Sequence, residues 1–128
     1  MKFFTLTVAL CCCLLSIPMH SQAQQKPSSE HEQKALKEAQ QIRNELLAGA
    51  DFSELAQQHS DDLGSAMLGG KLGFMGKGLL VPEYEAAALA LSKGDISEPV
   101  KTEFGYHIIQ LIEIEEGRFN TRHILIKP

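Results

Sequence analysis

Residues 106–115, YHIIQLIEIE, form a run that is apolar on both of its alternating faces. Because this pattern is typical of a strand covered on both sides, the run predicts a central strand of a sheet. A second run, from His123 to Ile126, is apolar and partly β-branched, and Pro128 follows it closely. It predicts another strand, which ends before the proline. These two strands therefore come late in the chain.

Helix signals precede the two strands. A capping box formed by Ser29 and Glu32 predicts a helix that ends before Gly49. The apolar residues of this helix recur at gaps of four, three and four, and they are Ala35, Ala39, Ile42 and Leu46. A second capping pattern, Asp51 with Glu54, predicts a shorter helix. Its apolar face holds Phe52, Leu55 and Ala56.

The middle of the chain is more irregular. HSDDLGSAMLGG predicts a loop with one helical turn near Ser65, and KLGFM predicts a short strand with a bulge or close backbone contact at Gly73. Pro82 favours the first turn of a helix that runs through Leu91, and Gly94 closes it. The predicted class is α+β, with helices first and most strands late.

Residues 1–23 are predicted to be a secretory signal peptide. A positively charged end precedes an apolar run that stops at Leu15, too short to span a membrane, and a small-x-small site ends at Ala23. Cleavage near Ala23 would leave a polar spacer over residues 24–28 and one domain over residues 29–128.

The three cysteines, Cys11–Cys13, all lie in the predicted signal peptide. They raise a lipoprotein signal as the alternative, although Leu10 stands where that signal needs a small residue. The chain left after cleavage has no cysteine and therefore no disulfide. With Lys2 removed it has 11 basic and 16 acidic residues, a net charge of −5, which argues against a nucleic-acid partner.

Motifs for covalent or metal chemistry are missing from the sequence. It contains no G-x-S-x-G, and no zinc-type spacing of Cys and His remains after cleavage, so we expect no metal and no cofactor. GGKLGFMGKG fails as a phosphate loop because Gly78 stands where Ser or Thr is required. His107 and His123 lie on predicted strands, and Asp61-Asp62 lie in a loop. Taken alone, the two histidines are best interpreted as hydrogen-bonded structural residues.

Four segments, SDDLGSA, GGKLGF, VPEYE and GYHII, occur in this order between about Gln33 and Ile112. In order and spacing they closely resemble the parvulin family of peptidyl-prolyl cis/trans isomerases, in particular its exported bacterial, SurA-like members. Each segment alone is a weak signal, but the set is highly specific. The resemblance implies a parvulin-like fold, a small antiparallel sheet of about four strands with helices packed around it.

Parvulins carry a histidine on the first strand, an acid or cysteine in the loop before the glycines, and a histidine that opens the last strand. The resemblance assigns the loop acid to Asp62 and the last-strand histidine to His107. Thr102 falls at the hydroxyl position that supports them, and His123 would be the other histidine. The resemblance also implies an apolar proline pocket, with Leu72, Phe74, Met75, Leu80 and Tyr84 as candidates. For Leu72 and Phe74, an ordinary place in the core is an equal alternative.

The chain departs from the family at the first strand. A parvulin begins with a strand of the RHIL kind, but here the matching segment, TRHILIKP, stands at residues 121–128. Residues 119–128 are therefore either the start of a lost second repeat or a replacement first strand in a circularly permuted domain. In the second case the strand folds back beside its neighbour, within a monomer or in a strand-swapped dimer. We favour completion within one chain, as a monomer. An empty central slot would expose strand edges on both sides, which is an aggregation hazard for an exported protein.

For this hairpin we expect His107 directly opposite His123. Paired residue numbers then sum to 230, which predicts a loop from about Ile112 to Arg118. A two-residue turn at Glu116-Gly117 gives an odd sum and is expected to put the histidines out of register.

The resemblance implies a non-covalent isomerase that acts on X-Pro bonds of unfolded or proline-containing envelope polypeptides without selecting for phosphate. Such an enzyme would be periplasmic or secreted, with no membrane span. A peptide-binding chaperone module without isomerase activity is the alternative, and a poorly folding truncation product is a third interpretation. The first two are separated by whether Asp62, Thr102 and both histidines converge.

Overall fold

The computed structural model describes residues 29–128, which form an α+β fold as predicted. The helices are α1 (Glu30–Leu47), α2 (Phe52–His59), α3 (Leu63–Ala66) and α4 (Pro82–Ala90). The strands of one antiparallel sheet are β1 (Lys71–Met75), β2 (Val100–Thr102), β3 (Gly105–Glu115) and β4 (Arg118–Ile126). The predicted signal peptide (residues 1–23) and spacer (residues 24–28) lie outside the described residues.

Both predicted capping signals open helices. The Ser29 side chain accepts a hydrogen bond from the Glu32 amide at 3.2 Å, and the Asp51 carboxylate accepts one from the Glu54 amide at 2.9 Å. Each bond satisfies an amide that the first helical turn leaves without a partner. The four apolar residues that the sequence marks on α1 are all buried, namely Ala35, Ala39, Ile42 and Leu46.

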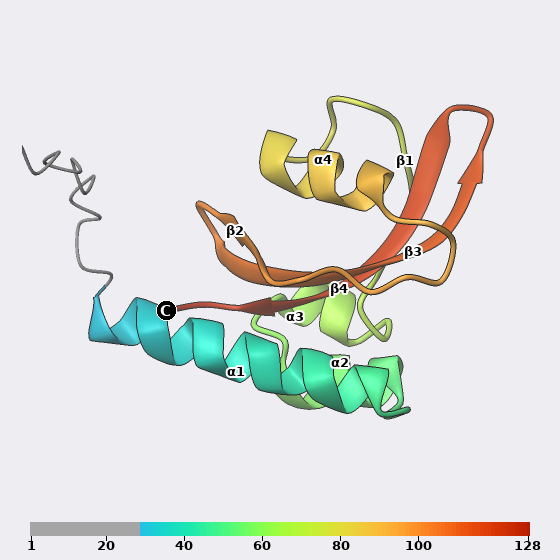
Figure 1. The fold of residues 1–128 in the computed structure, drawn as a ribbon. Coiled ribbons are helices and arrows are strands. Elements are labelled where there is room, and N and C mark those ends of the chain that lie inside the picture. Colours follow the sequence, from blue (N-terminus) through green and yellow to red (C-terminus); the bar gives the residue numbers. More distant parts are fainter. Residues whose placement is uncertain (1–28) are drawn as a thin grey trace, which may run out of the picture.

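The last strand of the chain lies inside the sheet. The strand order is β1-β4-β3-β2, so β4 pairs with β1 on one side and with β3 on the other. Figure 1 shows α1 and α2 on one side of the sheet and α4 on the other. β4 therefore occupies an internal position in the sheet of its own chain.

Alternating side chains of β3 and β4 serve two separate apolar layers. The layer against α1 and α2 receives Tyr106, Ile108, Ile124 and Ile126 from the sheet. The layer against α4 receives Ile109, Leu111 and Phe119. This burial on both sides explains why YHIIQLIEIE is apolar in both alternations. His107 and His123 lie on the α4 side, where both rings contact Tyr84 edge-on.

The connection between β3 and β4 differs from the prediction. Glu115 pairs with Arg118, so the connection is the two-residue turn Glu116-Gly117, and the predicted loop from Ile112 to Arg118 is wrong. Both turn residues have positive φ, 50° and 75°, as a type I′ hairpin turn requires. A β-bulge between Leu111 and Glu113 interrupts the ladder behind this turn.

The bulge also changes how the two histidines are related. His107 pairs with Leu125, and His123 pairs with Ile109, so the histidines are diagonal neighbours and not directly opposed. The prediction assumed a regular ladder. Next to the turn the numbers of paired residues have an odd sum, which would put the two histidines on opposite faces of the sheet. The extra residue on β3 makes this sum even beyond the bulge, and both histidines therefore point to the same face.

A short strand that the sequence did not indicate positions one candidate residue. β2 pairs with the start of β3, with Thr102 opposite Gly105.

The helix α4 ends at Ala90, one residue before the predicted end.

Candidate functional site

A cavity of about 670 Å³ opens beside α4 and the last strand. Leu72, Leu80, Val81 and Tyr84 give it an apolar side. Asp62, His107 and His123 give it a polar side. The other lining residues are Asp61, Leu63, Leu79, Phe104, Leu125 and Lys127.

A chain of hydrogen bonds runs along the polar side of the cavity. Thr102 Oγ1 lies 2.7 Å from His107 Nε2. The Nδ1 atoms of His107 and His123 lie 3.0 Å apart, and His123 Nε2 lies 2.7 Å from Asp62 Oδ2. The four residues come from β2, β3, β4 and the N-cap of α3. The structure thus brings together all four residues that the sequence singled out for the catalytic site.

The ends of this chain determine where its protons lie. Asp62 is an acceptor, so His123 donates from Nε2 and accepts at Nδ1. His107 therefore donates from Nδ1, and its Nε2 accepts from the Thr102 hydroxyl. The Phe104 amide donates to Thr102 Oγ1 at 3.1 Å, which leaves the hydroxyl proton for His107. Every donor in the chain thus points toward Asp62.

Burial keeps both histidines neutral. Desolvation lowers the pKa of His107 to about 4; repulsion from His123 adds to the effect, and Asp62 opposes it. Desolvation also lowers the pKa of His123, against the hydrogen bond and charge of Asp62. Burial acts to raise the pKa of Asp62, but the interactions with Ser65 and His123 together outweigh it and hold the pKa below the ordinary value of 3.8. At neutral pH the site combines one carboxylate with two neutral imidazoles.

Ser65 belongs to the same network, although the sequence did not single it out as a site residue. Its buried hydroxyl donates to Asp62 Oδ2 at 2.6 Å and lies 3.1 Å from His123 Nε2. Its amide lies 3.5 Å from Asp62 Oδ1, where Asp62 caps α3. The shorter bond goes to the oxygen that faces His123, so Ser65 orients the carboxylate toward the imidazole. The spacing of an Asp and a Ser three residues apart, at the start of a helical turn, was the available signal.

β4 also holds the loop that carries Asp62. The Asp61 amide donates to the Leu125 carbonyl at 2.7 Å, and the Leu125 amide donates to the Ser60 hydroxyl at 3.1 Å. The Lys127 amide donates to the Asp61 carboxylate at 2.8 Å. The position of Asp62 therefore depends on the same strand that supplies His123.

Gly70 ties the end of the α3 segment to His123. The His123 amide donates to the Gly70 carbonyl at 2.9 Å. Gly70 has a φ of +85°, and a Cβ at this position would lie 2.4 Å from the His123 carbonyl oxygen. Only glycine combines this backbone conformation with such a close approach.

Three of the five predicted pocket residues line the cavity. They are Leu72, Leu80 and Tyr84. Tyr84 is almost fully buried, and its hydroxyl lies 3.0 Å from Thr121 Oγ1. Its ring contacts both imidazoles edge-on, with centroids 5.3 Å from His107 and 5.6 Å from His123. Burial raises the pKa of Tyr84, so the phenol stays neutral.

The other two predicted pocket residues do not line the cavity. The guanidinium carbon of Arg118 lies over the Phe74 ring, 5.4 Å from the centroid of the ring. Met75 packs in the apolar layer under α4. The resemblance implied both as pocket candidates, but a β-bulge between Lys71 and Gly73 changes the register of β1 before these two residues. Five apolar residues that the sequence did not indicate also line the cavity, namely Leu63, Leu79, Val81, Phe104 and Leu125.

Within residues 29–128, no cluster of His, Cys, Asp and Glu has the arrangement of a metal site. None of the helices in this range has the length and apolar character needed to cross a membrane.

Known proteins resemble this chain in sequence. A family model described as the PPIC-type PPIASE domain (rotamase) matches residues 14–113. Chaperone SurA from Nitrosococcus oceani is 51% identical over 73 residues, which are 57% of this chain and 17% of the relative. Foldase protein PrsA from Geobacillus sp. is 50% identical over 82 residues, which are 64% of this chain and 30% of the relative. The chain therefore spans less than a third of the length of either relative.

Solved structures resemble it as well. The crystal structure of peptidylprolyl isomerase PrsA from Bacillus cereus matches with a TM-score of 0.61 and 48% identity, over 63% of this chain and 31% of that chain. The PrsA structure from Bacillus anthracis matches with a TM-score of 0.57 and 41% identity, over 73% of this chain and 39% of that chain. The family match ends at residue 113, before β4 and His123.

Proposed function

The chain belongs to the PPIC-type peptidyl-prolyl cis/trans isomerase family, and on this premise we propose that it catalyses cis/trans exchange of X-Pro bonds in unfolded polypeptides. One observation carries the proposal: an apolar cavity meets the hydrogen-bond network that links Asp62 to Thr102 through both histidines. The residues proposed for catalysis are Asp62, Thr102, His107 and His123. Those proposed for substrate binding are Leu72, Leu80, Val81 and Tyr84.

The proposed reaction breaks no covalent bond. Rotation about an X-Pro bond is slow because amide resonance gives a barrier of roughly 18–20 kcal/mol. A site that binds the twisted amide more tightly than either planar isomer lowers this barrier. Leu80 and Tyr84 hold the proline ring while the rest of the amide turns. The Tyr84 ring has a fixed orientation in the cavity because its hydroxyl is hydrogen-bonded to the Thr121 hydroxyl.

The polar network acts on the amide itself. The Asp62 side chain is 33% exposed at the cavity, whereas the His123 side chain behind it is 6% exposed. A carboxylate beside the substrate carbonyl disfavours the planar resonance form, which places negative charge on the carbonyl oxygen. The twisted amide lacks that charge separation and is disfavoured less. Ser65 and the two neutral imidazoles keep the carboxylate ionised and oriented.

The last strand supplies an essential part of this proposed site. β4 takes the place of the first strand expected of a parvulin, and its position between β1 and β3 supports this assignment. His123 then serves as the first-strand histidine in a circularly permuted domain over residues 29–128. Because the strand completes its own sheet, we propose a monomer and not a strand-swapped dimer.

Unfolded, proline-containing envelope polypeptides are the proposed substrates. The names chaperone and foldase among the relatives support an unfolded client, and the predicted signal peptide supports a location in the periplasm or outside the cell. Among residues 29–128, Lys127 is the one cationic residue that lines the cavity, and Asp61 and Asp62 line it too. This charge balance does not favour a phosphorylated substrate.

Exchange spectroscopy by NMR on a short Ala-Pro peptide tests the proposal. We expect the protein to accelerate exchange, and Asp62→Ala and Leu80→Ala to lower kcat/KM by roughly tenfold or more. Leu47→Ala is the control, because Leu47 is 57% exposed at the end of α1 and does not line the cavity. A folded protein that binds the peptide without accelerating exchange would be a peptide-binding module and would overturn the proposal.

A further inference from the structure

Exposed apolar side chains gather around the mouth of the cavity. Within residues 29–128, eight large apolar side chains are exposed, and three of them line this cavity. Leu63 is 73% exposed, Leu79 is 70% exposed and Phe104 is 52% exposed. Because Leu63 belongs to α3, the apolar lining continues from the cavity onto that helix.

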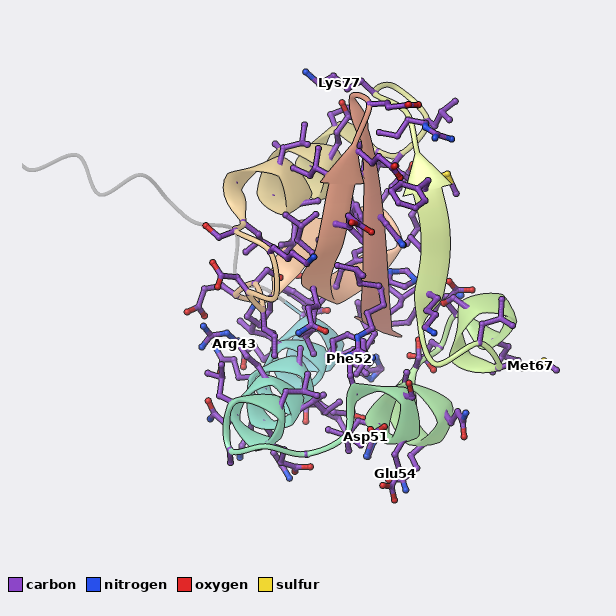
Figure 2. The ribbon with its side chains drawn as sticks, turned by 90° about the vertical axis from the view of Figure 1, so that its right-hand side faces the viewer. Arg43, Asp51, Phe52, Glu54, Met67 and Lys77 are labelled. Carbon is purple, nitrogen blue, oxygen red and sulfur yellow. The ribbon has the colours of Figure 1, made fainter. Side chains whose placement is uncertain are left out.

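The apolar surface extends along α3 beyond the cavity. Met67 follows Leu63 by one helical turn, and its amide lies 3.3 Å from the Leu63 carbonyl, so the two side chains share a face. Met67 is 81% exposed, and Leu68 is 64% exposed. Figure 2 shows Met67 pointing away from the body of the protein. We call Leu63, Met67 and Leu68 the α3 ridge.

The α3 ridge is uncharged and firmly placed. Residues 63–70, LGSAMLGG, contain no charged side chain, although 22% of the chain is charged. Two hydrogen bonds hold this segment in place. The Gly70 carbonyl accepts one from the His123 amide of β4, and the Ser65 hydroxyl donates the other to Asp62. An apolar surface held this close to a substrate cavity has a fixed position relative to whatever the cavity binds.

We propose that the α3 ridge docks a large apolar side chain of the unfolded polypeptide whose proline occupies the cavity. This inference rests on the proposed function and specifies the sequences on which the protein acts best. A second copy of this chain suits the ridge poorly. A stable interface buries about 1,200–2,000 Å² in total, far more than three side chains can cover.

The helix geometry sets the position of the docked side chain in the substrate. Four residues of helix advance about 6 Å, so Met67 lies about that far beyond the Leu63 position at the cavity. An extended peptide advances about 3.4 Å per residue. The ridge therefore reaches a side chain roughly two or three residues from the proline.

A series of alanine-rich peptides with one proline tests the inference. A single phenylalanine is moved from one to five residues away from the proline on either side, and kcat/KM for exchange is measured by NMR. We expect a roughly five- to tenfold gain at one position about two or three residues away. Met67→Ser and Leu63→Ser should each remove most of this gain. Ile114→Ser is the matched control, because Ile114 is 53% exposed and does not line the cavity.

The outcomes separate this inference from the proposed function. If the protein isomerises every peptide equally, or if Ile114→Ser removes the gain as well, the ridge inference is overturned and the proposed function stands. If no peptide is isomerised, the proposed function itself fails. Sedimentation velocity of the wild-type protein and of Met67→Ser tests whether a second copy of this chain binds the ridge instead. A dimer that the substitution dissociates, with no change in peptide preference, would assign the ridge to self-association and overturn the inference.

Discussion

The Nδ1 atoms of His107 and His123 lie 3.0 Å apart, although neither residue is the other's pairing partner across β3 and β4. The two rings stack with an angle of 23° between their planes and centroids 5.2 Å apart. This contact depends on the bulge at Ile112, because the two-residue turn alone would set one histidine on each face. The geometry of a hairpin turn and that of the candidate site are thus linked through one extra residue.

Replacing His123 with alanine should destabilise the protein and abolish exchange. The change removes one donor to the Asp62 carboxylate, and it leaves the buried Nδ1–H of His107 without its acceptor. We expect a loss of roughly 1–3 kcal/mol in the free energy of unfolding, measured by urea titration. His59→Ala is the control, because the His59 side chain is 38% exposed. Normal exchange by a folded His123→Ala protein would remove His123 from the site.

The hydrogen-bond order predicts one tautomer for each histidine. At pH 7 His107 should carry its proton on Nδ1, and His123 should carry its proton on Nε2. Long-range ¹H–¹⁵N NMR correlations distinguish these forms directly. Asp62→Asn should disturb the assignment of His123, because an amide can donate as well as accept. If wild-type His107 is protonated on Nε2, the direction of the chain is wrong.

Stability should fall as the pH is lowered through the range in which the unfolded histidines titrate. The pKa of His107 is about 4 in the folded protein against 6.5 in the unfolded chain, so between these values the unfolded chain binds more protons. The lowered pKa of His123 acts in the same direction. The contribution of His107 to the free energy of unfolding is at most about 3 kcal/mol. It is fully present above pH 6.5 and is lost toward pH 4. Urea titrations at pH 7, 6, 5 and 4.5 measure it.

A non-titrating residue at the same position gives the control for this pH dependence. His107→Gln should flatten the slope between pH 6.5 and 4.5 while leaving the contribution of His123. Asp62 adds its own loss only at lower pH, below 3.8, because its pKa is lowered in the folded protein. Equal slopes for wild type and His107→Gln would show that His107 is not held neutral by burial.

Removing the Ser65 hydroxyl should raise the pKa of Asp62. Burial then acts on that carboxylate with one fewer hydrogen bond to oppose it. Carboxyl ¹³C chemical shifts measured against pH report the change, and unfolding of Ser65→Ala should show a loss of roughly 1 kcal/mol. Ser92→Ala is the control at an exposed serine. An unchanged Asp62 titration in Ser65→Ala would leave Ser65 with only a structural role.

Gly70→Ala should cost more stability than the same substitution at Gly78. Both glycines have similar positive φ, 85° and 84°, but only at Gly70 would the new Cβ meet a backbone oxygen, that of His123. At Gly78 no atom lies within 4 Å, so that variant measures the strain of the backbone conformation alone, about 1 kcal/mol. Thermal unfolding of the two variants isolates the contact. Equal losses would mean that Gly70 tolerates the side chain and that the tie between α3 and β4 is loose.

Local signals in the sequence determined most of the elements. The capping residues Ser29 and Asp51 define helix starts by bonds to amides three residues away, and Pro82 opens α4 in the same local manner. The apolar pattern of residues 106–115 marks a strand buried on both sides because burial acts on each residue separately. The four candidate site residues, Asp62, Thr102, His107 and His123, came from a family resemblance in the same sequence.

Only the tertiary structure decided how these parts meet. Each of the two β-bulges is a departure of one residue from a regular ladder. The bulge between Lys71 and Gly73 lies where Gly73 predicts one, but no residue of β3 marks the bulge at Ile112, whose position follows from packing across strands. The first bulge turned Phe74 away from the cavity, and the second brought His107 beside His123. The role of Ser65 could not be predicted from the sequence either. Its hydrogen bond to Asp62 is part of the site only because the fold places His123, 58 residues later in the chain, beside the same carboxylate. Hydrogen bonds between distant segments depend on the whole fold, and the sequence states only which residues are able to make them.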